Sequence, residues 1–402
     1  MKNIPFSPPD VGGSEIEEVI KVLKSGWITS GPKKAEFEKM LCEYCGVSGA
    51  IALSSATVCM ELVLRMLGVG PGDEVITSAY TYTASASVIY HVGAKIVLVD
   101  TKPDSFEMDY DSLENAITEK TKVIIPVDVG GRICDYKKIY KAVENKKHLF
   151  NPGNSEILKK FGRIVVLADA AHSLGSKQGE KFSGQFADFT SFSFHAVKNL
   201  TTAEGGAIVW KKNEILDGES LYKNFMLLSL HGQNKDALNK VQAGAWEYDI
   251  VFPGYKCNMT DIQAALGVSQ LKRYDKMLAH RRTLVENYNK ELKNYTIQTL
   301  VHFDDDNVSN CHLYLARFPI TSEQRNEIIA ECGKLGVSLN VHYKPLPLLT
   351  AYKNLGFKIE DYKNAYNQYC NEITFPLYST LSFENQEYVI EVFKKVYNDI
   401  VK

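Results

Sequence analysis

Two short segments of the sequence carry side chains that could do chemistry together. In the first, Val165–His172, an apolar run ends at Asp169 and continues with small residues. In the second, Ser191–Gly206, a run of serine and phenylalanine leads to Lys198 and then to a glycine pair. A lysine lodged at the end of a buried strand loses amine pKa through desolvation and becomes a competent nucleophile. A buried acid at a neighbouring strand end could bind a cationic ring nitrogen, so the two segments predict one site.

Each of these two residues has a simpler interpretation when taken alone. An aspartate at a strand end is more often a helix cap, and a lone lysine is usually a solvated surface residue. The presence of both segments, in this order, favours the chemical interpretation. It requires that both apolar runs are strands of one parallel sheet, because ligands bind at the carboxyl ends of such strands.

The pattern around these segments indicates such a sheet. Several runs rich in Val, Ile and Phe have the length of strands, and their near-continuous apolarity is typical of strands buried on both faces. Helical patterns separate them, which predicts a mainly parallel sheet with helices on both faces. The expected strands are Glu74–Thr77, Lys95–Asp100, Lys122–Asp128, Ile164–Asp169, Asp188–Phe194 and Gly206–Trp210. The expected helices between them are Val58–Leu67, Ala84–Val92 and Ser112–Ile117.

The chain is expected to begin with a helix and to change character beyond about Asp261. Ser14 and Glu17 have the spacing of a capping box, and Gly26 is expected to end this first helix. Its apolar face consists of Ile16, Val19, Ile20 and Leu23. A long helix, Asp261 to about Leu292, leads to a second α/β set with a strand near Cys311–Phe318, a helix near Glu323–Leu335, a strand near Val337–Tyr343 and a terminal helix near Glu384–Ile400. We predict a large domain of residues 1–260 and a smaller α/β domain of residues 261–402.

Composition argues against several classes of protein. The formal net charge of −2 gives no electrostatic basis for binding nucleic acid or an anionic membrane. No apolar run is long enough to span a bilayer, and the proline-containing start lacks the apolar core of a signal peptide. Eight cysteines among 402 residues are too sparse for a disulfide scaffold. Cys42 and Cys45 have no second Cys/His pair nearby at metal-ligand spacing, so we expect reduced thiols, no metal site and a cytoplasmic protein.

Further segments match, in order along the chain, the motifs of one known family. They are Ser25–Pro32, Ser54–Thr57, Gly68–Val75, Asp169–His172, Ser193–Lys198, Gly254–Asp261 and Val341–Tyr343. With these segments the sequence resembles the DegT/DnrJ/StrS family of sugar aminotransferases, which depend on pyridoxal 5′-phosphate (PLP). The resemblance spans nearly the whole chain. It implies the α/β fold of a fold-type-I PLP-dependent transferase, which is also that of aspartate aminotransferase.

The resemblance implies a catalytic pair. Lys198 would hold PLP covalently and, once displaced by an amine substrate, would move a proton between the substrate carbon and the cofactor. Asp169 would keep the pyridine nitrogen protonated, so that the ring can accept negative charge. Dehydratase-type relatives carry a histidine at the lysine position, so Lys198 favours amino transfer.

The same resemblance implies further contacts with the cofactor. Tyr82 matches the aromatic residue that stacks on the ring, although by itself it would be interpreted as a core aromatic. Ser55, Ala56 and Thr57 precede a helix whose free N–H groups would bind the phosphate. The Ser193 hydroxyl would add to this phosphate site, and an ordinary helix cap there would be compatible with it.

The resemblance also implies that two subunits share each site. His172 and His195 match histidines near the ring and the phosphate, but each could equally be an ordinary core histidine. Relatives take one cofactor contact from the partner subunit, at the segment matching residues 254–259. Many relatives have Asn where this chain has Lys256 and Arg where it has Asn258, so which of the two reaches the cofactor stays open. We therefore expect a homodimer with shared active sites.

The substrate is less well indicated than the cofactor. The run Glu204-Gly205-Gly206 is typical of relatives that act at sugar C4. Asp128 stands near the substrate side, where many relatives have a histidine, so a relative's substrate cannot be carried over. Possible substrate contacts, equally interpretable as packing and turn residues, are Trp27, Thr29, Asn199 and His342.

We expect amino transfer from glutamate to a keto-sugar, with a nucleotide-linked 4-keto-6-deoxy sugar for surface-glycan biosynthesis as the first hypothesis. One alternative keeps the cofactor and changes the acceptor to an aldehyde or ketone of a higher-carbon keto-acid sugar, of the 8-amino-octulosonate type. Another is a non-catalytic ligand sensor with this fold, although such proteins usually add a DNA-binding module.

Overall fold

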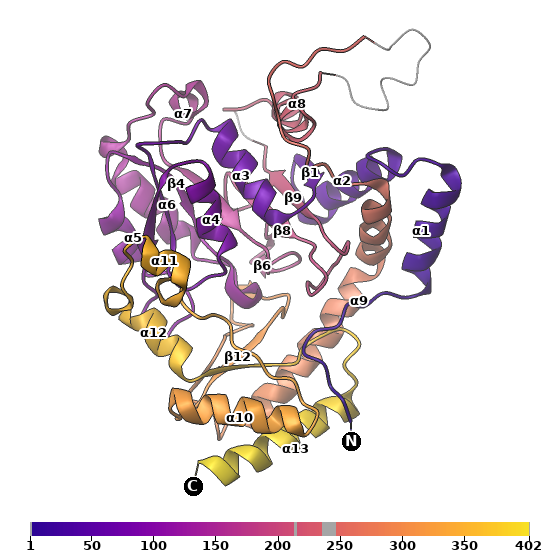
Figure 1. Cartoon of the computed structure of the whole chain (residues 1–402), viewed down its shortest axis with the longest axis vertical. Coiled ribbons are helices and arrows are strands. Elements are labelled where there is room, and N and C mark those ends of the chain that lie inside the picture. The colour runs from indigo at the N-terminus through magenta and orange to yellow at the C-terminus, as the bar shows by residue number, and fades with distance from the viewer. Residues whose placement is uncertain (1, 213–214, 235–246, 402) are drawn as a thin grey trace.

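A central seven-stranded sheet organises the first part of the chain in the computed structural model, which describes residues 2–212, 215–234 and 247–401 (Figure 1). The strands follow one another across the sheet as β1 (Gly49–Leu53), β9 (Gly206–Trp210), β8 (Phe189–Ser193), β5 (Val165–Asp169), β4 (Thr121–Ile125), β2 (Glu74–Ser78) and β3 (Lys95–Val99). Strands β8, β5, β4, β2 and β3 are parallel, whereas β9 runs antiparallel to both β8 and β1. The predicted mainly parallel sheet is confirmed, and β1, which the sequence pattern did not indicate, completes its edge.

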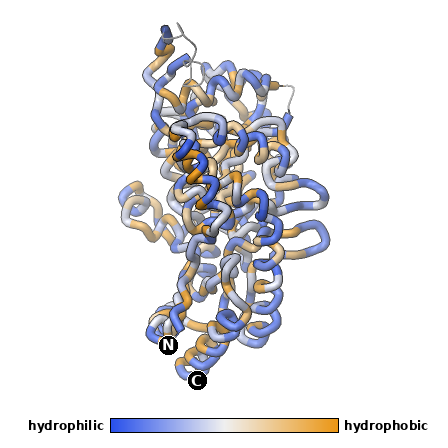
Figure 2. The backbone as a smooth tube through the Cα atoms, turned by 90° about the vertical axis from the view of Figure 1, so that its right-hand side faces the viewer, coloured by the Kyte–Doolittle hydropathy of each residue, from blue (hydrophilic) through white to orange (hydrophobic). Residues whose placement is uncertain are grey.

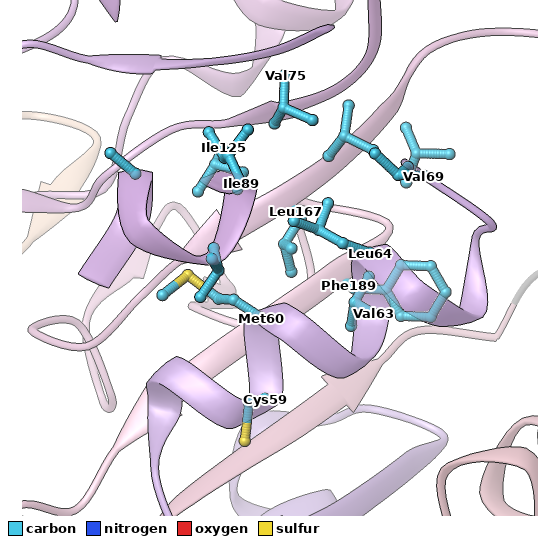
Figure 3. Packing of buried hydrophobic residues seen from close by; sticks show 14 of the residues in the cluster. Cys59, Met60, Val63, Leu64, Val69, Val75, Ile89, Ile125, Leu167 and Phe189 are labelled. Carbon is cyan, nitrogen blue, oxygen red and sulfur yellow. The ribbon is translucent and has the colours of Figure 1, made fainter. Parts of the chain in front are cut away.

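The strands bury both faces, as their apolar runs predicted. Val165 and Leu167 of β5 belong to one apolar core, while Val166 and Ala168 belong to the other, because successive strand side chains point to opposite faces. The first core includes helices α3 (Ala56–Met66), α4 (Ala84–His91), α7 (Glu156–Phe161) and α8 (Gly218–Ser229). Figure 3 shows Met60 of α3 and Leu167 of β5 among the residues of this core. The second core includes α2 (Pro32–Cys45), α5 (Tyr110–Ala116), α6 (Tyr136–Asn145) and part of α9 (Asp261–Leu292).

The C-terminal part of the chain forms a third apolar core around a small sheet. This sheet has the order β10 (Gln298–Thr299), β12 (Tyr314–Arg317) and β13 (Glu372–Phe375), and α10 (Ser322–Lys334) and α13 (Phe383–Ile400) pack on it (Figure 1). Helix α9 contributes Val268 to the second core and Leu284 to the third. The division into residues 1–260 and 261–402 stays a prediction, since α9 takes part in cores on both sides of it. The remaining short elements are β6 (Lys177–Gln178), β7 (Lys181–Phe182), β11 (Asn307–Val308), α11 (Thr350–Asn354) and α12 (Lys363–Cys370).

The expected strand near Val337–Tyr343 is wrong. Only isolated bridges occur there, from Val337 to Ile4 and from Asn340 to Thr374. The backbone N–H of His342 donates to the Glu372 carboxylate at 2.9 Å, so a side chain takes the place of a neighbouring strand's carbonyl. This segment leaves the sheet edge and enters the site described below.

Helix α1 (Gly13–Ser25) departs from its sequence prediction in two ways. Its N-cap is Gly12, whose backbone N–H donates to the carboxylate of Glu15 at position N3 at 2.8 Å, so the expected box of Ser14 and Glu17 is wrong. The buried side of the helix carries Glu15 and Val22, because Glu15 pairs with Arg273 of α9 at 3.0 Å. The apolar residues Ile16, Ile20 and Leu23 are exposed in this single chain. Figure 2 shows hydrophobic and hydrophilic residues alternating along the helices on this side of the molecule.

None of the described helices combines the length and apolarity needed to cross a bilayer.

Candidate active site

A cavity of about 410 Å³ lies where strands β2, β5 and β8 end. Asp169 and Ser193, the last residues of β5 and β8, line it, and so do Thr81 and Tyr82 just beyond β2. Residues far along the chain line it as well, namely His312, Leu313, Asn340, His342 and Tyr343. The sheet edge at which the sequence predicted a site therefore borders a cavity that distant parts of the chain enclose together.

Asp169 is a buried acid whose oxygens are both occupied by neutral donors. Ser85 Oγ donates to Oδ2 at 2.6 Å, and the backbone N–H of Ala171 donates to Oδ1 at 3.2 Å. Burial raises the pKa of Asp169, while these hydrogen bonds and the nearby Lys198 oppose that rise. No cation among the described residues lies within ion-pairing distance of the carboxylate. A cationic group brought into the cavity would therefore be stabilised by this acid and would hold it ionised.

Lys198 offers an amine in a state suited to nucleophilic attack. It follows β8 in a turn where its backbone N–H donates to the His195 carbonyl at 2.9 Å. Burial lowers the pKa of the amine to about 8, and the charge of Asp169 opposes part of that shift. Within the described part of the chain, the amine has no hydrogen-bond or ion-pair partner. At pH 7 roughly a tenth of the amine is therefore neutral, far more than for an exposed lysine, and the lone pair of this fraction is free to react.

The N-terminus of α3 forms an anion-binding wall of the cavity. Ser55 caps the helix by accepting from Val58 N at 3.2 Å, and the next N–H groups, of Ala56 and Thr57, have no partner within the helix. Gly206 of β9 passes so close that a Cβ there would lie 2.4 Å from Ala56 N. These free N–H groups lie at the positive end of the α3 helix dipole and can therefore bind a phosphate.

Two buried histidines lie against each other, with their rings tilted, beside the acid and the amine. His172 Nδ1 accepts from the Gly130 N–H at 3.2 Å, so the ring hydrogen lies on Nε2, which is 3.0 Å from the hydroxyl of Tyr343. The phenol therefore accepts from His172 and keeps its own hydrogen to donate. The ring of His312 lies 4.3 Å from that of His172, and its Nδ1 is 2.9 Å from Asn199 Oδ1. Burial places the pKa of both histidines well below the usual value, so both rings are neutral.

Most of the residues that the sequence singled out surround this one cavity. Those that line it are Ser55, Ala56, Thr57, Tyr82, Asp169, His172, Ser193, His195, Lys198 and His342. His195 is an exposed member with Nε2 3.6 Å from Glu204. Tyr82 is 62% exposed, which leaves its ring face available to a ligand.

The other predicted residues lie outside the cavity lining. Trp27 Nε1 donates to the Ser30 carbonyl at 3.1 Å, and the Thr29 carbonyl accepts from Asp261 N at 3.0 Å at the start of α9. Asn199 is buried and holds His312 by the contact given above. Lys256 donates to the Asn258 side chain, whose Nδ2 donates to Ser30 Oγ at 2.6 Å. The site roles of these five residues stay predictions.

Asp128 does not face the substrate side as expected. It is 1% exposed and does not line the cavity. Its carboxylate accepts from Cys134 N at 3.0 Å and from Ser173 Oγ at 2.7 Å. Burial raises its pKa to about 6. Asp128 is thus a structural acid that anchors the loop carrying Gly130, the donor to His172.

Sequence reasoning missed Ser85, His312 and Tyr343. Ser85 lies four residues after Thr81, and its Oγ is 2.9 Å from that hydroxyl, so the hydroxyl-rich stretch after β2 was the signal that could have found it. His312 comes from a segment with no local pattern that marks a site, whereas Tyr343 lies in the motif Val341–Tyr343, from which only His342 was singled out. Among the described residues, no group of His, Cys, Asp and Glu has the arrangement of a metal site.

Comparison with known proteins assigns the chain to a family. A family model described as the DegT/DnrJ/EryC1/StrS aminotransferase family matches residues 9–394. The chain belongs to this family. Among its DegT/DnrJ/EryC1/StrS relatives, the spore coat polysaccharide biosynthesis protein SpsC of Bacillus subtilis is 36% identical over 99% of this chain and 97% of that protein.

Solved structures of similar proteins share the whole fold. The putative sugar aminotransferase Spr1654 from Streptococcus pneumoniae, in its PMP form, is 55% identical with a TM-score of 0.96 and covers 99% of this chain and 100% of that chain. Its PLP form gives 53% identity and a TM-score of 0.95, with full coverage of both chains. Helicobacter pylori PseC, an aminotransferase involved in the biosynthesis of pseudoaminic acid, is 28% identical with a TM-score of 0.85 over 99% of this chain and 100% of that one.

This DegT/DnrJ/EryC1/StrS protein is a PLP-dependent sugar aminotransferase with the fold predicted from its sequence. The cavity fits the cofactor, because it combines three groups that PLP requires. They are an amine of lowered pKa, a buried acid with no cationic partner in the described part of the chain, and a helix N-terminus able to bind a phosphate.

Proposed function

We propose that the protein transfers an amino group from glutamate to a nucleotide-linked 4-keto-6-deoxy sugar for surface-glycan biosynthesis. The observation that carries the amino-transfer chemistry is the low-pKa amine of Lys198, which has no partner among the described residues and lies in the same cavity as the Asp169 carboxylate. The run Glu204-Gly205-Gly206 supports amination at C4, and Glu204 and Gly205 line the cavity. The names of SpsC and PseC, which refer to polysaccharide and pseudoaminic acid biosynthesis, support a glycan-related substrate.

We assign the residues the following roles. The α3 N-terminus, with Ser55, Thr57 and Ser193, binds the cofactor phosphate. When bound, PLP supplies an electron-accepting ring that stabilises negative charge on the substrate carbon. The Asp169 carboxylate holds the proton of the ring nitrogen, and Lys198 Nζ moves the proton at the substrate carbon.

The test is amino transfer to a panel of keto-sugars by PLP-reconstituted protein. With glutamate as donor, nucleoside-diphosphate 4-keto-6-deoxyhexoses should be aminated faster than 3-keto isomers or 8-keto-octulosonate. Lys198→Ala should lose both turnover and the visible absorbance of the bound cofactor. Lys39→Ala, which changes an exposed lysine of α2, is the matched control and should keep both.

Other outcomes of this panel point elsewhere. Preferred amination of the octulosonate would favour the higher-carbon acceptor, and cofactor loading without turnover of any donor would favour the non-catalytic sensor. A wild-type protein that stays colourless after reconstitution would refute the assignment of Lys198.

We also propose a homodimer in which Lys256 or Asn258 reaches the cofactor of the partner subunit. Both residues lie outside their own chain's cavity, and α1 leaves Ile16, Ile20 and Leu23 exposed, which is unusual for an apolar helix face. Sedimentation should give a dimer, and Ile20→Glu should weaken it, whereas the exposed control Lys24→Glu should not.

Shared sites can be tested by complementation between two inactive variants. Lys198→Ala and a double substitution of Lys256 and Asn258 to Ala should each be inactive alone. Co-expression should restore part of the activity, because one site of the mixed dimer is intact. Failure to recover activity in a verified mixed dimer would contradict sharing.

We place the enzyme in the cytoplasm, a proposal supported by eight cysteines that are all free thiols.

A further inference from the structure

A chain of hydrogen bonds links the cavity-lining residue His342 to a fully buried acid. Nδ1 of His342 lies 2.9 Å from Thr374 Oγ1, and Thr374 Oγ1 lies 2.6 Å from Glu372 Oε1. The second carboxylate oxygen of Glu372 accepts from the backbone N–H of His342 at 2.9 Å. Glu372 and Thr374 are two residues apart on β13, so their side chains lie on the same face of that strand. Both are fully buried, so water does not compete for these bonds.

The rest of the surroundings fix the imidazole in place. Tyr80 Oη donates to the His342 carbonyl at 2.5 Å, so both backbone polar groups of His342 are held. The ring of Phe6 stacks on the imidazole with centroids 5.5 Å apart. Within the described residues, Nε2 has no partner, and His342 and Phe6 both line the cavity. Nε2 is therefore the one ring atom of His342 left to bind a ligand through a hydrogen bond.

The protonation state of Glu372 decides whether Nε2 of His342 donates or accepts a hydrogen bond. If Glu372 is ionised, Thr374 donates to it and must accept from His342, so the ring hydrogen is on Nδ1 and Nε2 is an acceptor. If Glu372 is protonated, it can donate to Thr374, which then donates to Nδ1, and Nε2 carries the hydrogen. Burial lowers the pKa of His342 to about 3, so the ring stays neutral and the two tautomers are the relevant states.

We propose that Glu372 and Thr374 are positioning residues that set the tautomer of His342, and that His342 Nε2 hydrogen-bonds a keto or hydroxyl oxygen of the sugar substrate. The first part stands on the contacts alone. The second part rests on the proposed function for its substrate class. Neither Glu372 nor Thr374 lines the cavity, so their effect on the substrate passes through His342.

Among the described residues, few charged or titratable groups lie near Glu372 and could change its protonation state. The guanidinium of Arg325 on α10 lowers the pKa of Glu372, but burial outweighs it and the pKa is raised to about 8. Arg317 lies opposite Glu372 in the sheet, and its guanidinium pairs instead with Asp104 at 3.0 Å. Among the described residues, the phenols of Tyr80 and Tyr343 also face Glu372, and burial raises their pKa values.

The charge that acts on the ring itself comes from Lys198. Its amine contributes to the lowered pKa of His342 and loses its own charge near pH 8. Because His342 is neutral throughout, the amine cannot change its charge state in this range. We expect Nε2 to carry the hydrogen at pH 7, and the hydrogen to move to Nδ1 as the pH rises through about 8, where Glu372 ionises.

The tautomer can be measured without any turnover. Solid-state ¹⁵N spectra of PLP-loaded protein labelled at histidine nitrogens, with His342→Gln to assign the signal, should show this transfer of the hydrogen in the wild type between pH 6.5 and 9.5. Glu372→Gln should hold the hydrogen on Nε2 at every pH, because an amide donates to Thr374 and its oxygen still accepts from the His342 N–H. Thr374→Val should remove the pH response, and Thr374→Ser should keep it.

Turnover of a nucleoside-diphosphate 4-keto-6-deoxyhexose tests the contact with the sugar. Loss of one hydrogen bond corresponds to about a 3- to 10-fold fall in kcat/KM in Thr374→Val, with rescue in Thr374→Ser. Thr299→Val, in a strand outside the site, is the matched control. If the His342 tautomer does not respond to pH in the wild type, the proposal that Glu372 and Thr374 set this tautomer is overturned.

A tautomer that changes as expected while kcat/KM in Thr374→Val stays at the wild-type value overturns the contact with the sugar. If no keto-sugar is aminated at all, the proposed function fails. The ¹⁵N spectra still test in that case whether Glu372 and Thr374 set the tautomer of His342.

Discussion

The hydrogen bond from Ser85 to Asp169 offers a sharp test of how the cavity controls its acid. Asp169 is buried and forms no ion pair with any residue that the structure describes, and Ser85 Oγ donates to its Oδ2 at 2.6 Å. The Thr81 hydroxyl lies 2.9 Å from Ser85 Oγ and can donate to it, which leaves the serine hydrogen for the carboxylate. Removing this donor by Ser85→Ala leaves Asp169 with the longer bond from the Ala171 N–H alone.

The size of the effect follows from the strength of such a bond. A hydrogen bond to an ionised group contributes about 1.5–3 kcal/mol, and one pKa unit corresponds to about 1.4 kcal/mol. The Asp169 pKa, which burial already raises, should therefore rise by about one to two further units in Ser85→Ala. A carboxyl that is protonated over a wider pH range cannot hold the proton of a cofactor ring nitrogen by charge.

The assay is the pH dependence of kcat/KM for the amino donor, together with a pH titration of the cofactor absorbance. The acidic limb of the profile should move to higher pH by about one to two units in Ser85→Ala, since activity requires the ionised acid. Ser87→Ala is the matched control, because Ser87 lies on the same helix and donates to the Ala84 carbonyl at 3.3 Å. An acidic limb that stays in place in Ser85→Ala, with the cofactor bound, would refute the view that this bond holds Asp169 ionised.

Three more predictions follow from individual contacts. In the PLP-free protein, the amine of Lys198 should react with trinitrobenzenesulfonate with a midpoint near pH 8, and a midpoint near that of the exposed lysines would contradict its desolvation. In Gly206→Ala the new Cβ would lie 2.4 Å from Ala56 N. This overpacking should lower the free energy of unfolding by about 1–3 kcal/mol. It should also weaken PLP binding, which absorbance titration measures. Asp128 has a pKa raised to about 6 from 3.8, so the folded state holds its proton more tightly than the unfolded state. The free energy of unfolding of the wild type should therefore fall by up to about 3 kcal/mol relative to that of Asp128→Asn as the pH rises from 4 to 6. Urea unfolding of both proteins across this range measures this change. A difference in unfolding free energy that stays constant with pH would contradict the desolvation of the carboxyl.

The central sheet could be predicted because its strands are short, apolar and buried on both faces. Such runs stand out against the amphipathic helices between them, and Gly206–Trp210 was predicted with the bounds that the structure gives. Strand β1 was missed because Gly49–Leu53 lies between two helices in a run of small residues, and only its pairing with β9 makes it a strand. The face of α1 was misjudged for a related reason. Periodicity identifies an apolar stripe, but it does not say whether the same chain covers it.

Local patterns were enough to locate Asp169 and Lys198, because Asp169 ends one strand and Lys198 follows another, and the apolar run of each strand is visible in a window of a few residues. They also indicated a helix N-terminus shortly after Ser55, although the helix expected from Val58 begins at Ala56. The side chains that complete the cavity could be identified only from the folded chain. Tyr343 reaches His172 across 171 residues of chain, and Asp128 faces inward although its neighbour Val127 lines the cavity. Contacts of this kind depend on how distant elements pack, and no local periodicity or spacing records that packing.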